Sequence, residues 1–191
     1  MTYFKKIKEY VVESSPAVVL GHVYRLPSGF PAFLRVHNEL IEGAPDRIEG
    51  ELLKLCAPDL VYTLLDEFHG VSALVPEKSL HFKEKIFVQI NNGDFCEANI
   101  YVMNRAKLPK TAACIFGGRW REDLNTNPAL AQTLTARQLD YIRRLSTASG
   151  RDIIPIDLEL YRELIGLELI IDKGRRLALS RLGKEVVKGL A

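Results

Sequence analysis

The spacing of the apolar residues changes about two thirds of the way along the chain, and this change most constrains the fold. Up to about residue 126 the apolar residues form short runs, rich in β-branched residues and punctuated by Gly, Pro and Asn. Such runs are typical of strands and tight turns. From about residue 133 they recur every three or four positions, as in amphipathic helices. We therefore predict an α+β protein, with a β-rich domain over residues 1–126 and a small helical domain over 127–191.

Within the β-rich domain the sequence predicts three strands followed by a hairpin. The strands are expected over residues 17–25, 32–37 and 47–55. Two further strand-like runs flank Asn92-Gly93, the strongest short signal for a β-hairpin. The short connections are consistent with a small mixed β-barrel or a curled sheet.

A short helix is expected between the third strand and the hairpin. Pro58 suits the first helical position, and Gly70 is a natural stop at the C-terminal end. Leu60, Leu64 and Phe68 recur at a spacing of four, so they are predicted to form the apolar face.

The C-terminal segment predicts a helix capped by Thr135 and closed by Gly150, then a second helix from about Pro155. A strand, an Asp-Lys-Gly turn, a second strand and a helix capped by Ser180 follow.

Composition excludes some classes of function. The net charge is only +2, and no apolar run approaches the roughly 20 residues that span a bilayer, so we expect no membrane partner. The N-terminus lacks the pattern of a secretory signal, which favours the cytoplasm.

Cys56, Cys96 and Cys114 are widely spaced and without a CxxC pattern, so they are expected to be reduced and mostly buried. No metal or other cofactor is expected.

Five short strings, in the same order and spacing, resemble the gamma-glutamylcyclotransferase-like family. They are Gly-His-Val-Tyr-Arg-Leu at 21–26, Gly-Phe-Pro-Ala at 29–32, Glu-Gly-Glu-Leu at 49–52, Leu-Leu-Asp-Glu-Phe-His-Gly at 64–70 and Gly-Gly-Arg-Trp-Arg at 117–121. Two residues depart from the family pattern: His69 stands at the place of the catalytic glutamate, and Arg119 replaces an aspartate.

The resemblance implies a fold and a reaction. The fold is the family's small mixed β-barrel with short helices. In the reaction, the α-amine of a γ-glutamyl group attacks its own γ-carbonyl, which releases 5-oxoproline and a free amine or amino acid. His69 would be the catalytic residue, because an imidazole exchanges protons near neutral pH. Asp66, three positions earlier on the same helical face, would orient the ring. The family resemblance places the bound γ-glutamyl metabolite near Gly21, Pro31, Ala32 and Gly70.

The family also holds the substrate with a Tyr-Gly-Ser-Leu loop after its first strand, and the sequence contains no such string. We therefore expect an altered or incomplete active site. A sheet that lacks its first strand would have an open edge, and such an edge pairs readily with another chain. A homodimer is accordingly expected.

Two interpretations other than catalysis stay open: a non-catalytic module, and a nucleic-acid-binding role for the C-terminal domain. His69 lies near a helix C-terminus, where an imidazolium is favoured by the exposed carbonyls without any role in catalysis. The chain would then be a non-catalytic module that senses a ligand or binds a protein.

The C-terminal domain resembles a winged-helix module, with Arg175 and Arg176 in the wing. Its second helix carries Asp157, Glu159 and Glu163, which would repel phosphates. Nucleic acid is therefore disfavoured as a partner, and a protein contact or a core-capping role is preferred.

Overall fold

The computed structural model describes residues 6–37, 43–90, 93–149 and 152–190. It divides into two compact units. The β-rich unit comprises Tyr3–Leu26 and Phe30–Asn127, and the C-terminal unit comprises Pro128–Ala191 with the short segment Pro27–Gly29. Each is described by itself.

The β-rich unit is built on one long strand, β1 (Val11–Arg25), which pairs with four antiparallel strands, three of which lie outside the hairpin described next. These three are β3 (Asp46–Leu55), β2 (Pro31–Leu34) and β6 (Ala113–Cys114). β1 begins six residues before the predicted position because β3 pairs with it from Val11 onward.

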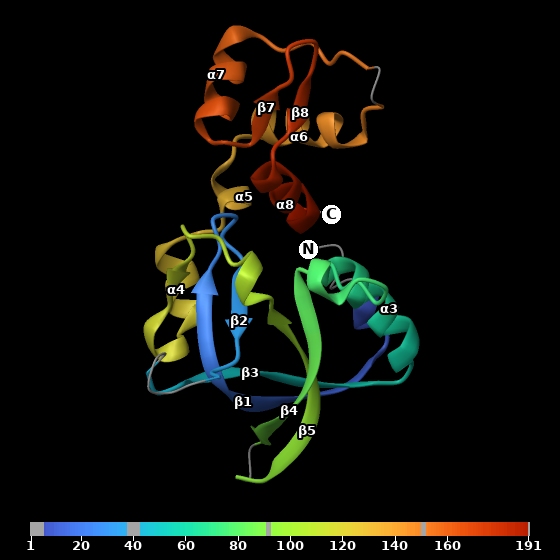
Figure 1. The fold of residues 1–191 in the computed structure, drawn as a ribbon, viewed down its shortest axis with the longest axis vertical. Coiled ribbons are helices and arrows are strands. Elements are labelled where there is room, and N and C mark those ends of the chain that lie inside the picture. Colours follow the sequence, from blue (N-terminus) through green and yellow to red (C-terminus); the bar gives the residue numbers. More distant parts are fainter. Residues whose placement is uncertain (1–5, 38–42, 91–92, 150–151, 191) are drawn as a thin grey trace. The chain divides into compact units, whose positions relative to one another are not determined.

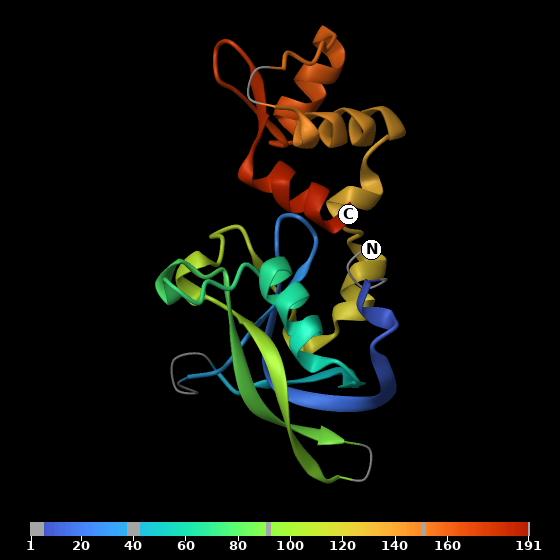
Figure 2. The same ribbon diagram turned by 90° about the vertical axis from the view of Figure 1, so that its right-hand side faces the viewer.

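A hairpin completes the sheet. β4 (His81–Ile90) meets β1 only at Ala17 and Val18, and it pairs along its length with β5 (Phe95–Met103). Figures 1 and 2 show these two strands running side by side. The strands predicted around Asn92-Gly93 are confirmed; Asn92 itself lies outside the described residues.

The mixed α and β architecture is confirmed, but the small mixed β-barrel predicted from the sequence is not closed in the structure. The six strands form an open sheet in the order β2-β1-β4-β5, with β3 and β6 also paired to β1. Among the described residues β4 is the only strand that pairs with β5, so the other edge of β5 has no hydrogen-bonded neighbour strand, although Met103 at the end of β5 packs with Ala32 and Leu34 of β2.

Helix α3 (Pro58–His69) has the predicted ends. Pro58 lies in its first turn, and Gly70 ends it in the left-handed conformation, with φ 63°. Its apolar face differs from the prediction, because Val61 is fully buried whereas Leu60 is 48% exposed. Shorter helical segments complete the unit: η1 (Pro76–Lys78), η2 (Arg105–Lys107), η3 (Phe116–Gly118) and α4 (Trp120–Thr126).

The C-terminal unit contains α5 (Leu130–Thr133), α6 (Ala136–Thr147), α7 (Leu158–Gly166), β7 (Ile170–Asp172), β8 (Leu177–Leu179) and α8 (Arg181–Leu190). The order of two helices, a hairpin and a helix agrees with the sequence prediction; the winged-helix arrangement itself stays a prediction. Its core is apolar and comprises Leu134, Tyr141, Ile142, Leu160, Leu164, Leu169, Ile170, Leu179 and Val186.

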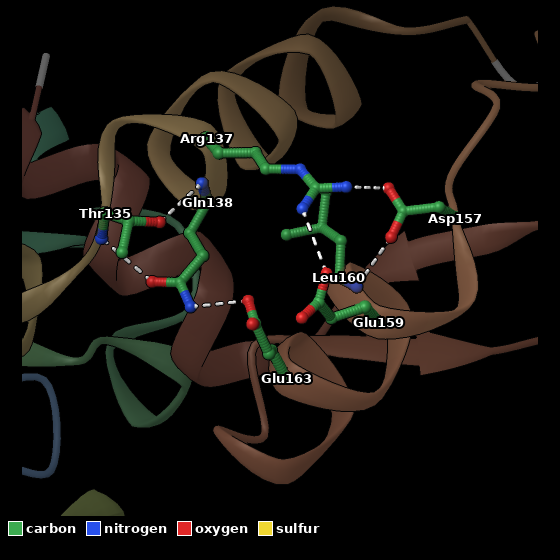
Figure 3. A network of polar contacts seen from close by, with 7 residues as sticks. All are labelled: Thr135, Arg137, Gln138, Asp157, Glu159, Leu160 and Glu163. Atoms are coloured by element: carbon green, nitrogen blue, oxygen red, sulfur yellow. Dashed lines mark hydrogen bonds and ion pairs between the residues drawn. The ribbon is translucent and has the colours of Figure 1, made fainter.

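Polar side chains join the starts of α6 and α7 (Figure 3). Thr135 caps α6 as predicted: its hydroxyl accepts the Gln138 N–H at 3.2 Å, and the Gln138 carboxamide accepts the Thr135 N–H at 2.9 Å. The same carboxamide donates to Glu163 on α7 at 3.0 Å. Glu163 is thereby bound to α6.

The N-terminus of α7 is capped by Asp157, whose carboxylate accepts the Leu160 N–H at 3.0 Å. This cap explains why α7 begins at Leu158 and not near Pro155. Arg137 of α6 forms ion pairs with both Asp157 and Glu159 (Figure 3).

Helix α8 approaches the chain before β7 closely at Gly183. A Cβ atom at this position would lie 2.1 Å from the Leu169 carbonyl oxygen, whereas a Cβ atom at Gly166 in α7 would meet nothing within 4 Å. We predict that Gly183→Ala lowers the free energy of unfolding by about 1–3 kcal/mol, since the backbone must shift. Gly166→Ala is the matched control and should be neutral or slightly stabilising. Urea denaturation followed by circular dichroism measures both, and equal effects would contradict the close approach.

Candidate functional site

The last turn of α3 lies against the β4–β5 hairpin and brings together the chemically active side chains of the β-rich unit. Asp66 and His69 come from the helix. Lys83 of β4 and Tyr101 of β5 are directly paired across the hairpin, so their side chains project from the same face. These four residues form what we call the α3–hairpin site.

Asp66 is the electrostatic centre of this site. The Tyr101 hydroxyl donates to its Oδ1 at 2.5 Å, and the Lys83 ammonium donates to its Oδ2 at 2.8 Å. Burial acts to raise the pKa of Asp66, but the two hydrogen bonds and the positive charges of Lys83 and His69 outweigh it. The pKa of the carboxyl therefore lies below its usual range.

Tyr101 is held in its neutral form. Burial, followed by the hydrogen bond to Asp66 and the negative charge of that residue, raises the pKa of the Tyr101 hydroxyl far above its ordinary value. At any physiological pH this group donates a proton to Asp66 in a hydrogen bond and does not act as a base.

His69 is positioned by ring contacts. Its imidazole stacks on the Tyr101 ring with centroids 4.1 Å apart and planes 12° apart. The His81 ring lies at 78° to the same imidazole with centroids 5.0 Å apart, and the His81 Nδ1 lies 2.8 Å from the His69 backbone oxygen. Stacking of this kind fixes the plane of the imidazole.

The predicted relation between Asp66 and His69 takes a different form in the structure. Both Asp66 oxygens are engaged by Tyr101 and Lys83, and His69 acts on Asp66 through its charge. Asp66 thus positions the Tyr101 ring, on which His69 stacks. The carboxylate therefore acts on the imidazole both through its charge and through the Tyr101 ring.

A second layer of contacts supports Lys83. Its ammonium lies 4.8 Å from the centroid of the Tyr62 ring, a distance typical of a cation–π contact. The Tyr62 hydroxyl accepts a hydrogen bond from Asn99 of β5 at 2.7 Å. The helix is therefore joined to the hairpin at two successive turns.

The other residues expected to contact a substrate lie in structural positions. Gly70 terminates α3, and its carbonyl accepts the Leu80 N–H at 2.9 Å. Gly21 lies in β1, where a Cβ atom would come within 2.4 Å of the Phe33 ring. Pro31 and Ala32 lie in β2, and Ala32 is 1% exposed in a small core cluster with Leu34 and Met103.

Sequence reasoning missed Lys83, Tyr101 and His81. None belongs to a string that resembles the family, and each lies in a strand where a charged or aromatic residue is unremarkable. Only the register of the hairpin, which pairs Lys83 with Tyr101, would have pointed to these two residues.

A cavity of about 1130 Å³ lies elsewhere in the β-rich unit, and neither His69 nor Asp66 lines it. Its walls come from β1, β3, the end of β4, η3 and α4, and they carry Arg47, Glu51, Trp120 and Arg121. Arg121 forms an exposed ion pair with Glu51, with nitrogen and oxygen 3.4 Å apart.

Three further findings concern the described part of the chain. It contains no group of three or more His, Cys, Asp or Glu side chains that could hold a metal ion. None of its helices is both long and apolar enough to cross a membrane. The three cysteines are free as expected, but the expectation of burial is wrong, since Cys56 is exposed and the other two are only partly covered.

The lowered pKa of Asp66 predicts how stability depends on pH. The contribution of the charged Asp66 side chain to the free energy of unfolding should be fully present above the pKa of an unfolded aspartate, near 4. This contribution should be lost as the pH falls through the lower pKa of Asp66 in the folded state. Asp66→Asn should therefore lose about 1–2 kcal/mol at pH 7, with a difference from the parent that shrinks below about pH 4.

Urea denaturation across this pH range measures the effect of Asp66→Asn. Glu77→Gln, which neutralises an exposed carboxylate in η1, is the matched control and should leave the stability profile unchanged. A constant difference between Asp66→Asn and the parent protein down to acid pH would contradict the charge-based account.

A comparison with protein-family models matches residues 2–122 to the family described as Gamma-glutamyl cyclotransferase, AIG2-like. The match covers most of the β-rich unit, including α3 and the hairpin. Parallel comparisons with curated proteins and with solved structures find no significant match. The family match agrees with the five strings and with the mixed α and β architecture, and we conclude that the chain belongs to the AIG2-like gamma-glutamyl cyclotransferase family.

Proposed function

We propose that the protein cyclises γ-glutamyl amines or γ-glutamyl peptides to 5-oxoproline, with His69 as the group that transfers the proton. The α-nitrogen of the substrate forms a bond to the γ-carbonyl carbon, and the bond from that carbon to the leaving nitrogen breaks. The attacking nitrogen loses a proton and the leaving nitrogen gains one. A single base that accepts the first proton and returns it to the leaving group satisfies both needs.

One observation carries this proposal: the imidazole at the family's glutamate position is held in a fixed plane against Tyr101. A proton-transfer group must keep its orientation while the substrate reacts, and a stacked ring does so at little entropic cost. Asp66 is hydrogen-bonded to Tyr101 and Lys83, so it supports the stacking without competing for the proton of His69.

Release of 5-oxoproline from a panel of γ-glutamyl amines and peptides tests the proposal. His69→Ala should lower kcat/KM by roughly 10²–10⁴, as expected for loss of a general base. His69→Glu restores the family residue and should retain turnover. His37→Ala removes a histidine outside the α3–hairpin site, so it is the matched control.

Circular dichroism of each variant separates loss of chemistry from loss of folding. Turnover by His69→Ala at the parental rate would exclude His69 as the base. If neither the parent protein nor His69→Glu released 5-oxoproline from any member of the panel, the enzymatic proposal would be wrong.

A second candidate function is binding of a γ-glutamyl metabolite without turnover. It is favoured by the position of the 1130 Å³ cavity, which lies apart from His69 and has arginine and glutamate side chains suited to a zwitterionic ligand. Trp120 lines this cavity and is the only tryptophan in the chain, so its fluorescence should report occupancy. A saturable fluorescence change without 5-oxoproline release supports this candidate. No change in the presence of γ-glutamyl compounds argues against it.

A further inference from the structure

The free edge of β5 has a hydrogen-bonding pattern that can be deduced from the end of the hairpin. The Ile90 N–H donates to the Asp94 carbonyl at 2.9 Å, which makes these two residues a hydrogen-bonded pair. Hydrogen-bonded and non-hydrogen-bonded pairs alternate along an antiparallel ladder. The backbone groups of Cys96, Ala98 and Ile100 therefore point toward β4.

The intervening residues of β5 present their backbone groups to the open edge. These are Phe95, Glu97, Asn99 and Tyr101, whose N–H and C=O groups meet no strand among the described residues. The first part of the strand is also the exposed part, with Phe95 67% exposed and Phe87 of β4 72% exposed on the same face. The exposed apolar face therefore adjoins the part of the edge that has no strand partner among the described residues.

We propose that a second copy of the chain pairs with this edge, β5 against β5, antiparallel and centred on Ala98. Phe95 then lies opposite Tyr101 of the second copy, and Glu97 lies opposite Asn99, each pair occurring twice by symmetry. All of these residues present their backbone N–H and C=O groups to the edge. In this register the two copies can therefore form hydrogen bonds to each other's backbone groups.

Side-chain chemistry selects this register over its neighbours. A shift that centred the pairing on Glu97 would place two carboxylates directly opposite each other, which is unfavourable. A shift centred on Asn99 would require Met103, which is 2% exposed and packed in the core, to pair with Phe95. The register centred on Ala98 uses residues 95–101 and puts an aromatic residue opposite an aromatic residue.

The pairing would also extend the α3–hairpin site. Tyr101 carries the stacked His69, and Phe95 of the second copy would lie beside Tyr101 on the same face of the continuous sheet. The inference itself rests on the free edge and not on the proposed reaction. Its test is therefore independent of any assay for 5-oxoproline.

Sedimentation velocity over a range of micromolar concentrations should show a dimer of the full chain. Glu97→Pro removes an N–H that points to the free edge and spares the bonds to β4, so it should give a folded monomer. Glu97→Gln is the matched control: it loses the same carboxylate and its exposed ion pair with Lys85 but keeps the N–H, and should stay dimeric. Asn99→Asp faces Glu97 of the second copy and should weaken the dimer roughly tenfold.

Cross-linking tests the register. Ala98 meets its own copy in a non-hydrogen-bonded pair, where Cα atoms are about 4.5 Å apart, within the range that a disulfide can bridge. With Cys56 and Cys96 replaced by serine, Ala98→Cys should form a covalent dimer under mild oxidation, and exposed Ala106→Cys should not. A monomeric parent protein, equal dimerisation of Glu97→Pro and Glu97→Gln, or cross-linking at Ala106→Cys alone would overturn the proposal.

Discussion

The hydrogen-bonded carboxylate of Asp66 is the interaction on which the functional part of the β-rich unit depends. It accepts from Tyr101 on β5 and from Lys83 on β4, so one side chain joins α3 to both strands of the hairpin. A carboxylate can play this part only while it is charged, and its lowered pKa keeps it charged. The stacked position of His69 follows from this interaction, because the imidazole rests on the ring that Asp66 holds.

The hairpin has different roles at its two ends. At one end, the face of the hairpin that carries Lys83 and Tyr101 is covered by α3 and holds the candidate catalytic group. Toward the other end the same face is exposed at Phe87 and Phe95, and the edge of β5 has no hydrogen-bonded partner among the described strands. Because Tyr101 belongs to both regions, pairing at the edge and chemistry at His69 would be physically adjacent.

Much of the local structure could be predicted from the sequence, because it depends on residues close together in the chain. Pro58 and Gly70 delimit α3, Thr135 caps α6, and Ser180 caps α8, where its hydroxyl accepts the Gly183 N–H at 2.9 Å. The buried face of α3 could not be read in the same way. The predicted face contains Leu60, yet Val61 is buried, since the packing of the rest of the unit selects among apolar residues on neighbouring faces.

The position of His69 at the end of a helix and at the family's glutamate place followed from sequence alone, because both depend on local pattern. Its environment was decided by tertiary structure. A two-residue turn centred on Asn92-Gly93 would have put Lys83 opposite Val102, whereas the hairpin closes at Ile90 and Asp94 and pairs Lys83 with Tyr101. A shift of one residue moves every side chain of a strand to the other face. The register of the hairpin therefore decided which residues surround Asp66 and His69, and which backbone groups β5 presents at its open edge.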